Sequence, residues 1–120
     1  MEANHDVAKY ASSVYDPGMV FIELPLFQKY LTLSDDELRS IQTTIMEHPN
    51  VGTVISGGKG LRKMRIPLPG RGKSGGARVI YYWQTSRSLC LLVFAYPKGI
   101  MNDLTDEQLK TLVKLAQEEL

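Results

Sequence analysis

One stretch of this sequence constrains the fold more than any other: residues 89–95 read Leu-Cys-Leu-Leu-Val-Phe-Ala, an unbroken apolar run. A strand with one face in water alternates apolar and polar residues, whereas a continuous apolar run is typical of a central strand covered on both faces. A chain of 120 residues is long enough for one domain with a single core. We therefore expect residues 89–96 to be a central strand, with Cys90 buried in the core.

Shorter runs of β-branched and aromatic residues predict the strands around it. They cover residues 20–24, 61–66 and 77–83, and residues 84–88 are expected to join the last of these to residues 89–96 as a hairpin. In the strand over residues 61–66, alternation places Lys63 and Arg65 on one face.

Two capping boxes predict where helices begin. Ser34 has Glu37 three residues after it, and the helix that begins there should run to about His48, since Pro49 ends it. Thr105 has Gln108 three residues after it and opens a terminal amphipathic helix. Residues 25–31 are expected to form a further, short helix. The predicted fold is α+β: a small, mainly antiparallel β-sheet packed by helices, in the order β-α-α-β-β-β-α.

The ends of the chain and its single cysteine predict its organisation and setting. Residues 1–18 have little pattern and end in a turn sequence, so we expect an N-terminal arm followed by one domain over residues 19–120. No secretory signal and no membrane-spanning run is apparent, and Cys90 has no cysteine to pair with. A cytoplasmic protein without a membrane partner is expected.

Charge is distributed very unevenly along the chain. Residues 48–102 hold nine Lys or Arg and no Asp or Glu, whereas residues 1–47 hold eight acidic and three basic side chains. A long segment without a carboxylate indicates a surface that meets an anion. The alternative is that these cations are solvated and paired with acids from the flanking segments.

Several kinds of site are disfavoured by the sequence. With His5 in the arm, His48 at a helix end and one cysteine, neither a zinc site nor a histidine-pair ribonuclease is expected. Residues 70–76 resemble a phosphate-binding loop only superficially, and the acids at 35–37 are explained by helix capping. We expect no metal and no cofactor.

The remaining candidate chemistry is cationic. If the strands over residues 61–66 and 77–83 pair, Lys63, Arg65 and Arg78 can converge on one phosphate, and Lys98 can reach it from the end of the last strand. Crowded cations repel one another unless an anionic ligand offsets the repulsion. The residues expected to bind RNA around these four cations are Arg62, Arg71, Lys73 and Tyr96. Two of them have an alternative: Arg62 can point away from Lys63, toward a protein partner or solvent, and Tyr96 is equally compatible with core packing.

A site of this kind can cleave RNA without metal or histidine. When a 2′-hydroxyl attacks the adjacent phosphorus, the phosphorane carries more negative charge than the starting diester, so fixed Arg donors stabilise it preferentially. A lysine among other cations loses its proton more readily and can act as general base. The expected products are a 2′,3′-cyclic phosphate and a 5′-hydroxyl.

Four segments together resemble the RelE/ParE toxin superfamily, in particular its HigB-type branch: residues 60–65, 75–82, 96–98 and 103–105. The resemblance covers roughly residues 19–120 and implies a microbial-ribonuclease-like fold that cleaves mRNA in the ribosomal A site. It also implies a cognate antitoxin, often a helix-turn-helix protein, through which the toxin is held at operator DNA.

The resemblance also implies roles for individual residues. By position, Lys63 and Arg65 match the basic pair of the family's second strand, Arg78 matches its phosphate-contacting Arg, and Lys98 matches a further basic residue. Many members have a catalytic Tyr or His near the C-terminus, and this chain has none after Tyr96.

Two alternatives remain open at this point. A gyrase-poisoning toxin of the same fold would not need converging catalytic cations. A non-catalytic RNA-binding module would use the same basic face without cleavage.

Overall fold

In the computed structural model, residues 19–70, 76–99 and 103–120 are described. Their helices and strands are, in chain order, β1 (Val20–Glu23), α2 (Asp35–Glu47), β2 (Thr53–Val54), β3 (Arg62–Pro67), β4 (Gly76–Gln84), a 3-10 turn (Thr85–Arg87), β5 (Leu89–Pro97) and α3 (Asp106–Glu119). The expected arm, residues 1–18, lies outside the described residues.

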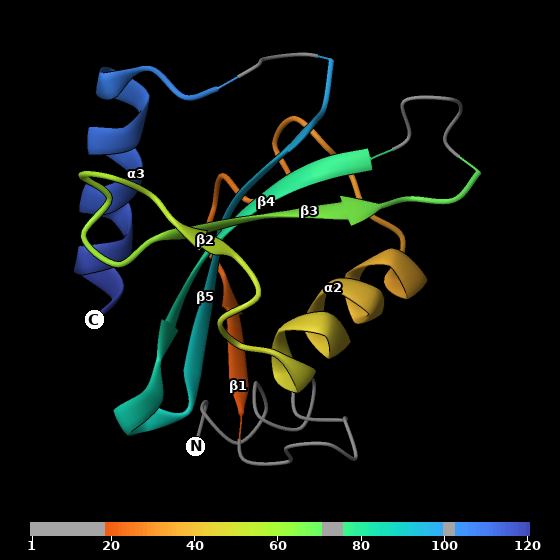
Figure 1. The fold of residues 1–120 in the computed structure, drawn as a ribbon, viewed down its shortest axis with the longest axis horizontal. Helices are drawn as coiled ribbons and strands as arrows, with labels where there is room; N and C mark the ends of the chain where they lie inside the picture. Colours follow the sequence, from red (N-terminus) through yellow and green to blue (C-terminus); the bar gives the residue numbers. More distant parts are fainter. Residues whose placement is uncertain (1–18, 71–75, 100–102) are drawn as a thin grey trace.

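The strands form one five-stranded sheet in the order β1-β5-β4-β3-β2 (Figure 1). β1 pairs with β5 in parallel, and all other neighbours are antiparallel. Helix α2 lies on one face and α3 on the other, each with its own layer of buried apolar side chains. The predicted α+β class with a mainly antiparallel sheet is confirmed.

β5 is an interior strand, between β1 and β4 and covered on both faces, as its apolar run predicts. Every residue from Leu89 to Tyr96 is buried, and successive side chains alternate between the α2 face and the α3 face. A bulge opposite Ile80 and Tyr81 interrupts this alternation, so Val93 and Phe94 both point to the α3 face. As a result, Tyr96 also belongs to the α3 face.

Both helices begin where their capping boxes predict. The Ser34 hydroxyl accepts from the backbone N–H of Glu37, and the Thr105 hydroxyl accepts from that of Gln108. In each case the side chain of the third helical residue accepts in return from the capping residue's own N–H. The acidic side chains after Ser34 thus serve the helix start.

The predicted helix over residues 25–31 is wrong, because this segment forms consecutive turns. The Phe27 N–H donates to the Leu24 carbonyl at 2.9 Å, and the Lys29 N–H donates to that of Leu26 at 3.2 Å. The chain crosses the sheet edge here, so Leu26 packs on the α3 face and Phe27 on the α2 face. Successive residues of a helix point about 100° apart, less than these opposite directions require, and a single short turn gains too little to compete.

The two-residue strand β2 was not predicted. It pairs with the start of β3, with Thr53 opposite Lys63 and Val54 opposite Arg62. The observed order is therefore β-α-β-β-β-β-α, and β2 brings the loop after α2 alongside the cationic strand.

Candidate functional site

The strand register brings together the cations that the sequence singled out. Arg65 on β3 lies directly opposite Arg78 on β4, and Arg78 lies opposite Tyr96 on β5. Lys63, two residues before Arg65, faces the same side of the sheet, the side that α3 covers in part. The predicted pairing of the two strands is confirmed.

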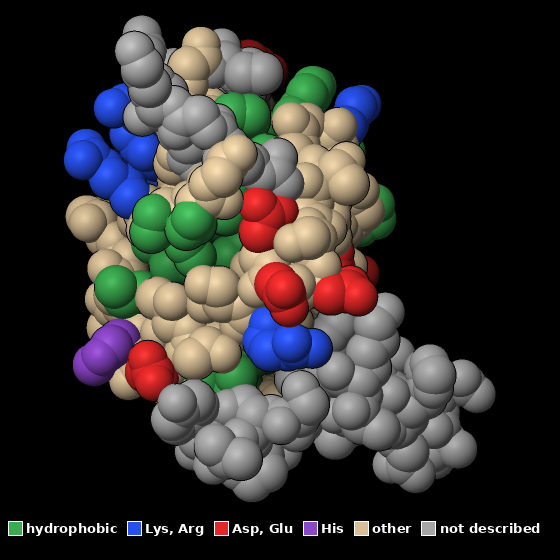
Figure 2. All heavy atoms as spheres, turned by 90° about the vertical axis from the view of Figure 1, so that its right-hand side faces the viewer, with side chains coloured by type: hydrophobic (Ala, Val, Ile, Leu, Met, Phe, Trp, Pro, Cys, Tyr) green, Lys and Arg blue, Asp and Glu red, His purple; other side chains and the backbone are tan. Residues whose placement is uncertain are grey.

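These cations line one hollow of about 630 Å³. The residues around it are Val51, Thr53, Lys63, Met64, Arg65 and Arg78. Figure 2 shows Lys and Arg side chains gathered at the upper left of its view, with exposed apolar side chains below them. The hollow combines a cationic wall from β3 and β4 with a wall from the segment that leads into β2.

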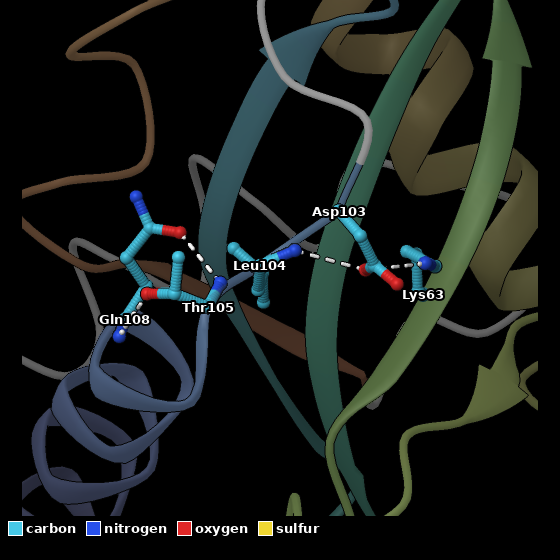
Figure 3. Close-up of polar contacts among 5 residues, drawn as sticks. All are labelled: Lys63, Asp103, Leu104, Thr105 and Gln108. Carbon is cyan, nitrogen blue, oxygen red and sulfur yellow. Dashed lines mark hydrogen bonds and ion pairs between the residues drawn. The ribbon is translucent and has the colours of Figure 1, made fainter.

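Within the described residues, one carboxylate approaches the cluster. The Lys63 ammonium donates to Asp103 Oδ1 at 3.2 Å, across 40 positions of sequence (Figure 3). The same oxygen accepts from the Leu104 N–H at 2.9 Å. That backbone hydrogen bond, followed by the contact with Lys63, lowers the pKa of Asp103 below its ordinary value. The alternative that the cations pair with acids from the flanking segments thus holds for Lys63. Arg65 and Arg78 have no described carboxylate within ion-pair distance.

Tyr96 lies beneath this cluster rather than on the surface. Its ring is fully buried beside Phe94, with the ring centroids 5.7 Å apart. Its hydroxyl is buried and has no hydrogen-bond partner in the part of the chain that is described. Burial raises the pKa of Tyr96, while the charges of Lys63 and Arg78 lower it. A ring without an exposed face cannot stack on a base unless its surroundings move, so this placement favours core packing over the predicted stacking role.

Lys98 is placed at the margin of the site. It is exposed just beyond β5, where its N–H donates to the Gly76 carbonyl at 3.2 Å, and it is not among the residues that line the hollow. Arg71 and Lys73 lie outside the described residues.

Arg62 makes contacts that the sequence did not predict. It lies on β3 opposite Tyr81, and its guanidinium donates to the Gly52 carbonyl at 2.7 Å and to the Asn50 carbonyl at 3.5 Å. Arg62 therefore holds the loop after α2. Its predicted RNA contact stays a prediction, because a guanidinium has further donors to offer.

Tyr81 holds the same loop from below. Its buried hydroxyl donates to the Pro49 carbonyl at 2.8 Å and accepts from the Gly52 N–H at 2.9 Å. A β-carbon at position 52 would lie 2.8 Å from Cε1 of Tyr81, so the loop can approach this closely only with glycine there. Sequence reasoning missed this support, because the partners are about 30 residues apart in the chain.

Neither a metal site nor a membrane span is found in the described ranges. No three His, Cys, Asp or Glu side chains there lie close enough together to hold a metal ion. No helix there is both long and apolar enough to cross a bilayer.

The fold and the hollow together define a small α+β protein with a cluster of Arg and Lys on its sheet. A family model described as the RelE toxin of the RelE/RelB toxin–antitoxin system matches residues 24–120. The chain therefore belongs to the RelE toxin family. It is a toxin of a toxin–antitoxin system, and a cognate antitoxin is its partner.

Proposed function

We propose that this toxin is an mRNA endonuclease that cuts in the ribosomal A site and so stops translation. The observation that carries the proposal is the single hollow lined by Lys63, Arg65 and Arg78, in which the two arginines face each other across neighbouring strands. Three cations around one open hollow are electrostatically complementary to the negative charge of an RNA phosphate.

The reaction follows from this charge arrangement. The 2′-oxygen attacks the adjacent phosphorus and gives its proton to a water molecule, while the Lys63 ammonium, paired with Asp103, stabilises negative charge at the reacting phosphate. The bond from phosphorus to the 5′-oxygen breaks, and that oxygen takes up a proton, which leaves a 2′,3′-cyclic phosphate and a 5′-hydroxyl. The donors of Arg65 and Arg78 stabilise the extra charge of the phosphorane, and Lys98 adds positive charge at the margin. The reaction uses side chains of the chain itself and requires no metal or cofactor.

The partners follow from the same proposal. mRNA occupies the hollow, Arg62 contacts RNA beside it, and Arg71 and Lys73 contact ribosomal RNA. The antitoxin is proposed to be a helix-turn-helix protein, and operator DNA is contacted only through it. Within the family, a HigB-type toxin is the proposed subtype.

The test compares three proteins in translating extracts and in bacteria: the parent, Arg78→Ala and Arg87→Ala. Arg87 is exposed in the 3-10 turn beyond the far end of β4, so its loss changes the net charge equally without touching the hollow. We expect codon-phased mRNA cuts with 5′-hydroxyl ends from the parent and from Arg87→Ala. Loss of one fixed donor should slow Arg78→Ala by about 100-fold or more.

Three outcomes would contradict the proposal. Equal cutting by Arg78→Ala would remove this hollow from the reaction. DNA double-strand breaks in place of mRNA cuts would identify a gyrase poison, and RNA binding without cleavage would identify a binding module.

A further inference from the structure

Side chains from two strands of the sheet, β3 and β4, hold the loop that leads from α2 to β2. Tyr81 bonds its Pro49 carbonyl and its Gly52 N–H, and Arg62 bonds its Gly52 carbonyl. Within the loop, the Val51 N–H donates to the His48 carbonyl at 2.9 Å. Its backbone is therefore fixed from two sides.

This fixed loop holds an apolar side chain out into water. Val51 is 47% exposed, although the residues on either side have their backbone groups anchored. A single exposed valine is ordinary on a protein surface, and Val54 is exposed to a similar extent, so what distinguishes Val51 is its position. Val51 lies on the wall of the cationic hollow, across from the Arg and Lys side chains.

The same side chain also borders a second, shallower hollow. Val51 shares this hollow of about 550 Å³ with Glu47, His48, Pro49 and Asn50. It contains no Lys or Arg and carries a carboxylate at its rim, so a second phosphate is disfavoured there. It offers instead two apolar side chains, from Pro49 and Val51, beside the amide of Asn50, which both donates and accepts.

We propose that this second hollow binds the base of the nucleotide next to the scissile phosphate, and that it contributes to the choice of cleavage site. A nucleotide places a neutral, flat, polar-edged ring one sugar away from its phosphate. The two hollows meeting at Val51 present the matching arrangement, with cations on one side and an apolar face with hydrogen-bonding groups on the other. Val51 contacts the ring face, and Asn50 hydrogen-bonds its edge.

The inference rests on the proposed function for its substrate, but binding can be measured apart from cleavage. The probes are a 2′-O-methyl dinucleotide, which cannot be cut, and the same molecule with one base removed. Binding to the parent, Val51→Ala, Asn50→Ala and Val54→Ala would be followed by NMR titration. Val54 is the matched control, because it is 54% exposed on the neighbouring β2 and lines neither hollow.

In the parent and in Val54→Ala, removing the base should weaken binding by about fivefold, the size expected for burying part of one apolar side chain against it. In Val51→Ala the two probes should bind almost equally. An undiminished effect of the base in Val51→Ala would overturn the proposal, as would an equal loss in Val54→Ala.

Cleavage gives the second readout. Val51→Ala and Asn50→Ala should change which nucleotides flank the mapped cuts, whereas Val54→Ala should reproduce the parent's pattern. An unchanged pattern in all variants would refute the base site while leaving the endonuclease in place. A parent that binds the dinucleotide but never cuts mRNA would refute the proposed function and leave the base site standing.

Discussion

The Tyr81 hydroxyl is the most informative single group to remove from this protein. Tyr81→Phe keeps the ring in the core but deletes the donor to the Pro49 carbonyl and the acceptor for the Gly52 N–H. Each hydrogen bond contributes about 1 kcal/mol net, and a buried donor left without a partner costs about 1–3 kcal/mol. Since Gly52 is buried, we expect the free energy of unfolding to fall by about 2–3 kcal/mol.

Thermal denaturation followed by circular dichroism measures this change. For a chain of this size 1 kcal/mol corresponds to about 4 °C in Tm, so Tm should fall by about 8–12 °C. Tyr30→Phe is the control, because Tyr30 is 50% exposed and its ring keeps its contact with Phe94. If both variants lose the same small amount, the loop does not depend on Tyr81, and the argument for a fixed Val51 fails with it.

Three further predictions concern the titrating groups Asp103 and Cys90. Asp103→Asn removes the charge that holds Lys63, so inorganic phosphate should bind about two- to fivefold more tightly by NMR titration. The pKa of Asp103 is lowered in the folded protein, so the ionised carboxylate contributes to stability above its ordinary pKa near 3.8. This contribution is lost as the pH falls through the pKa of the folded protein. Urea unfolding below about pH 4 should show the loss in the parent but not in Asp103→Asn. Burial raises the pKa of the Cys90 thiol above its ordinary value near 9.0. The buried neutral thiol therefore contributes to the free energy of unfolding in full below that pH, and the contribution is lost as the pH rises above it. Tm should therefore fall less steeply above pH 9 in Cys90→Ala than in the parent, and parallel pH profiles would contradict this.

Local and periodic features of the structure were predictable from the sequence. The apolar run at 89–95 predicted an interior strand covered on both faces, and the serine and threonine caps predicted the first residue of each helix. These signals are short-ranged, because a hydroxyl three residues from an amide and a side chain on every second position act within one element. Alternation likewise placed Lys63 and Arg65 on one face, where the hollow now lies.

The features that were missed depend on contacts between distant segments. The alternation that begins at Leu89 would send Tyr96 to the α2 face, and only the bulge at Val93 and Phe94 returns it to the face of the cations. The Asp103 contact with Lys63 and the Tyr81 support of the loop likewise join segments that no sequence pattern relates. The cationic wall of the candidate site could therefore be predicted from the charge pattern of the sequence, whereas the wall that contains Val51 could not.

Arg65 and Arg78 lie opposite each other in the sheet, an arrangement that function explains better than stability does. Like charges directly opposite each other on neighbouring strands destabilise a sheet, and no described carboxylate lies within ion-pair distance of either guanidinium. Lys63 has such a partner in Asp103, so its position is understandable without RNA. Among the described residues the arginine pair has no such partner, and an anion between the two guanidinium groups would turn their mutual repulsion into shared attraction. The pair, more than the total charge of the basic segment, is thus the part of the cluster that specifically calls for a phosphate.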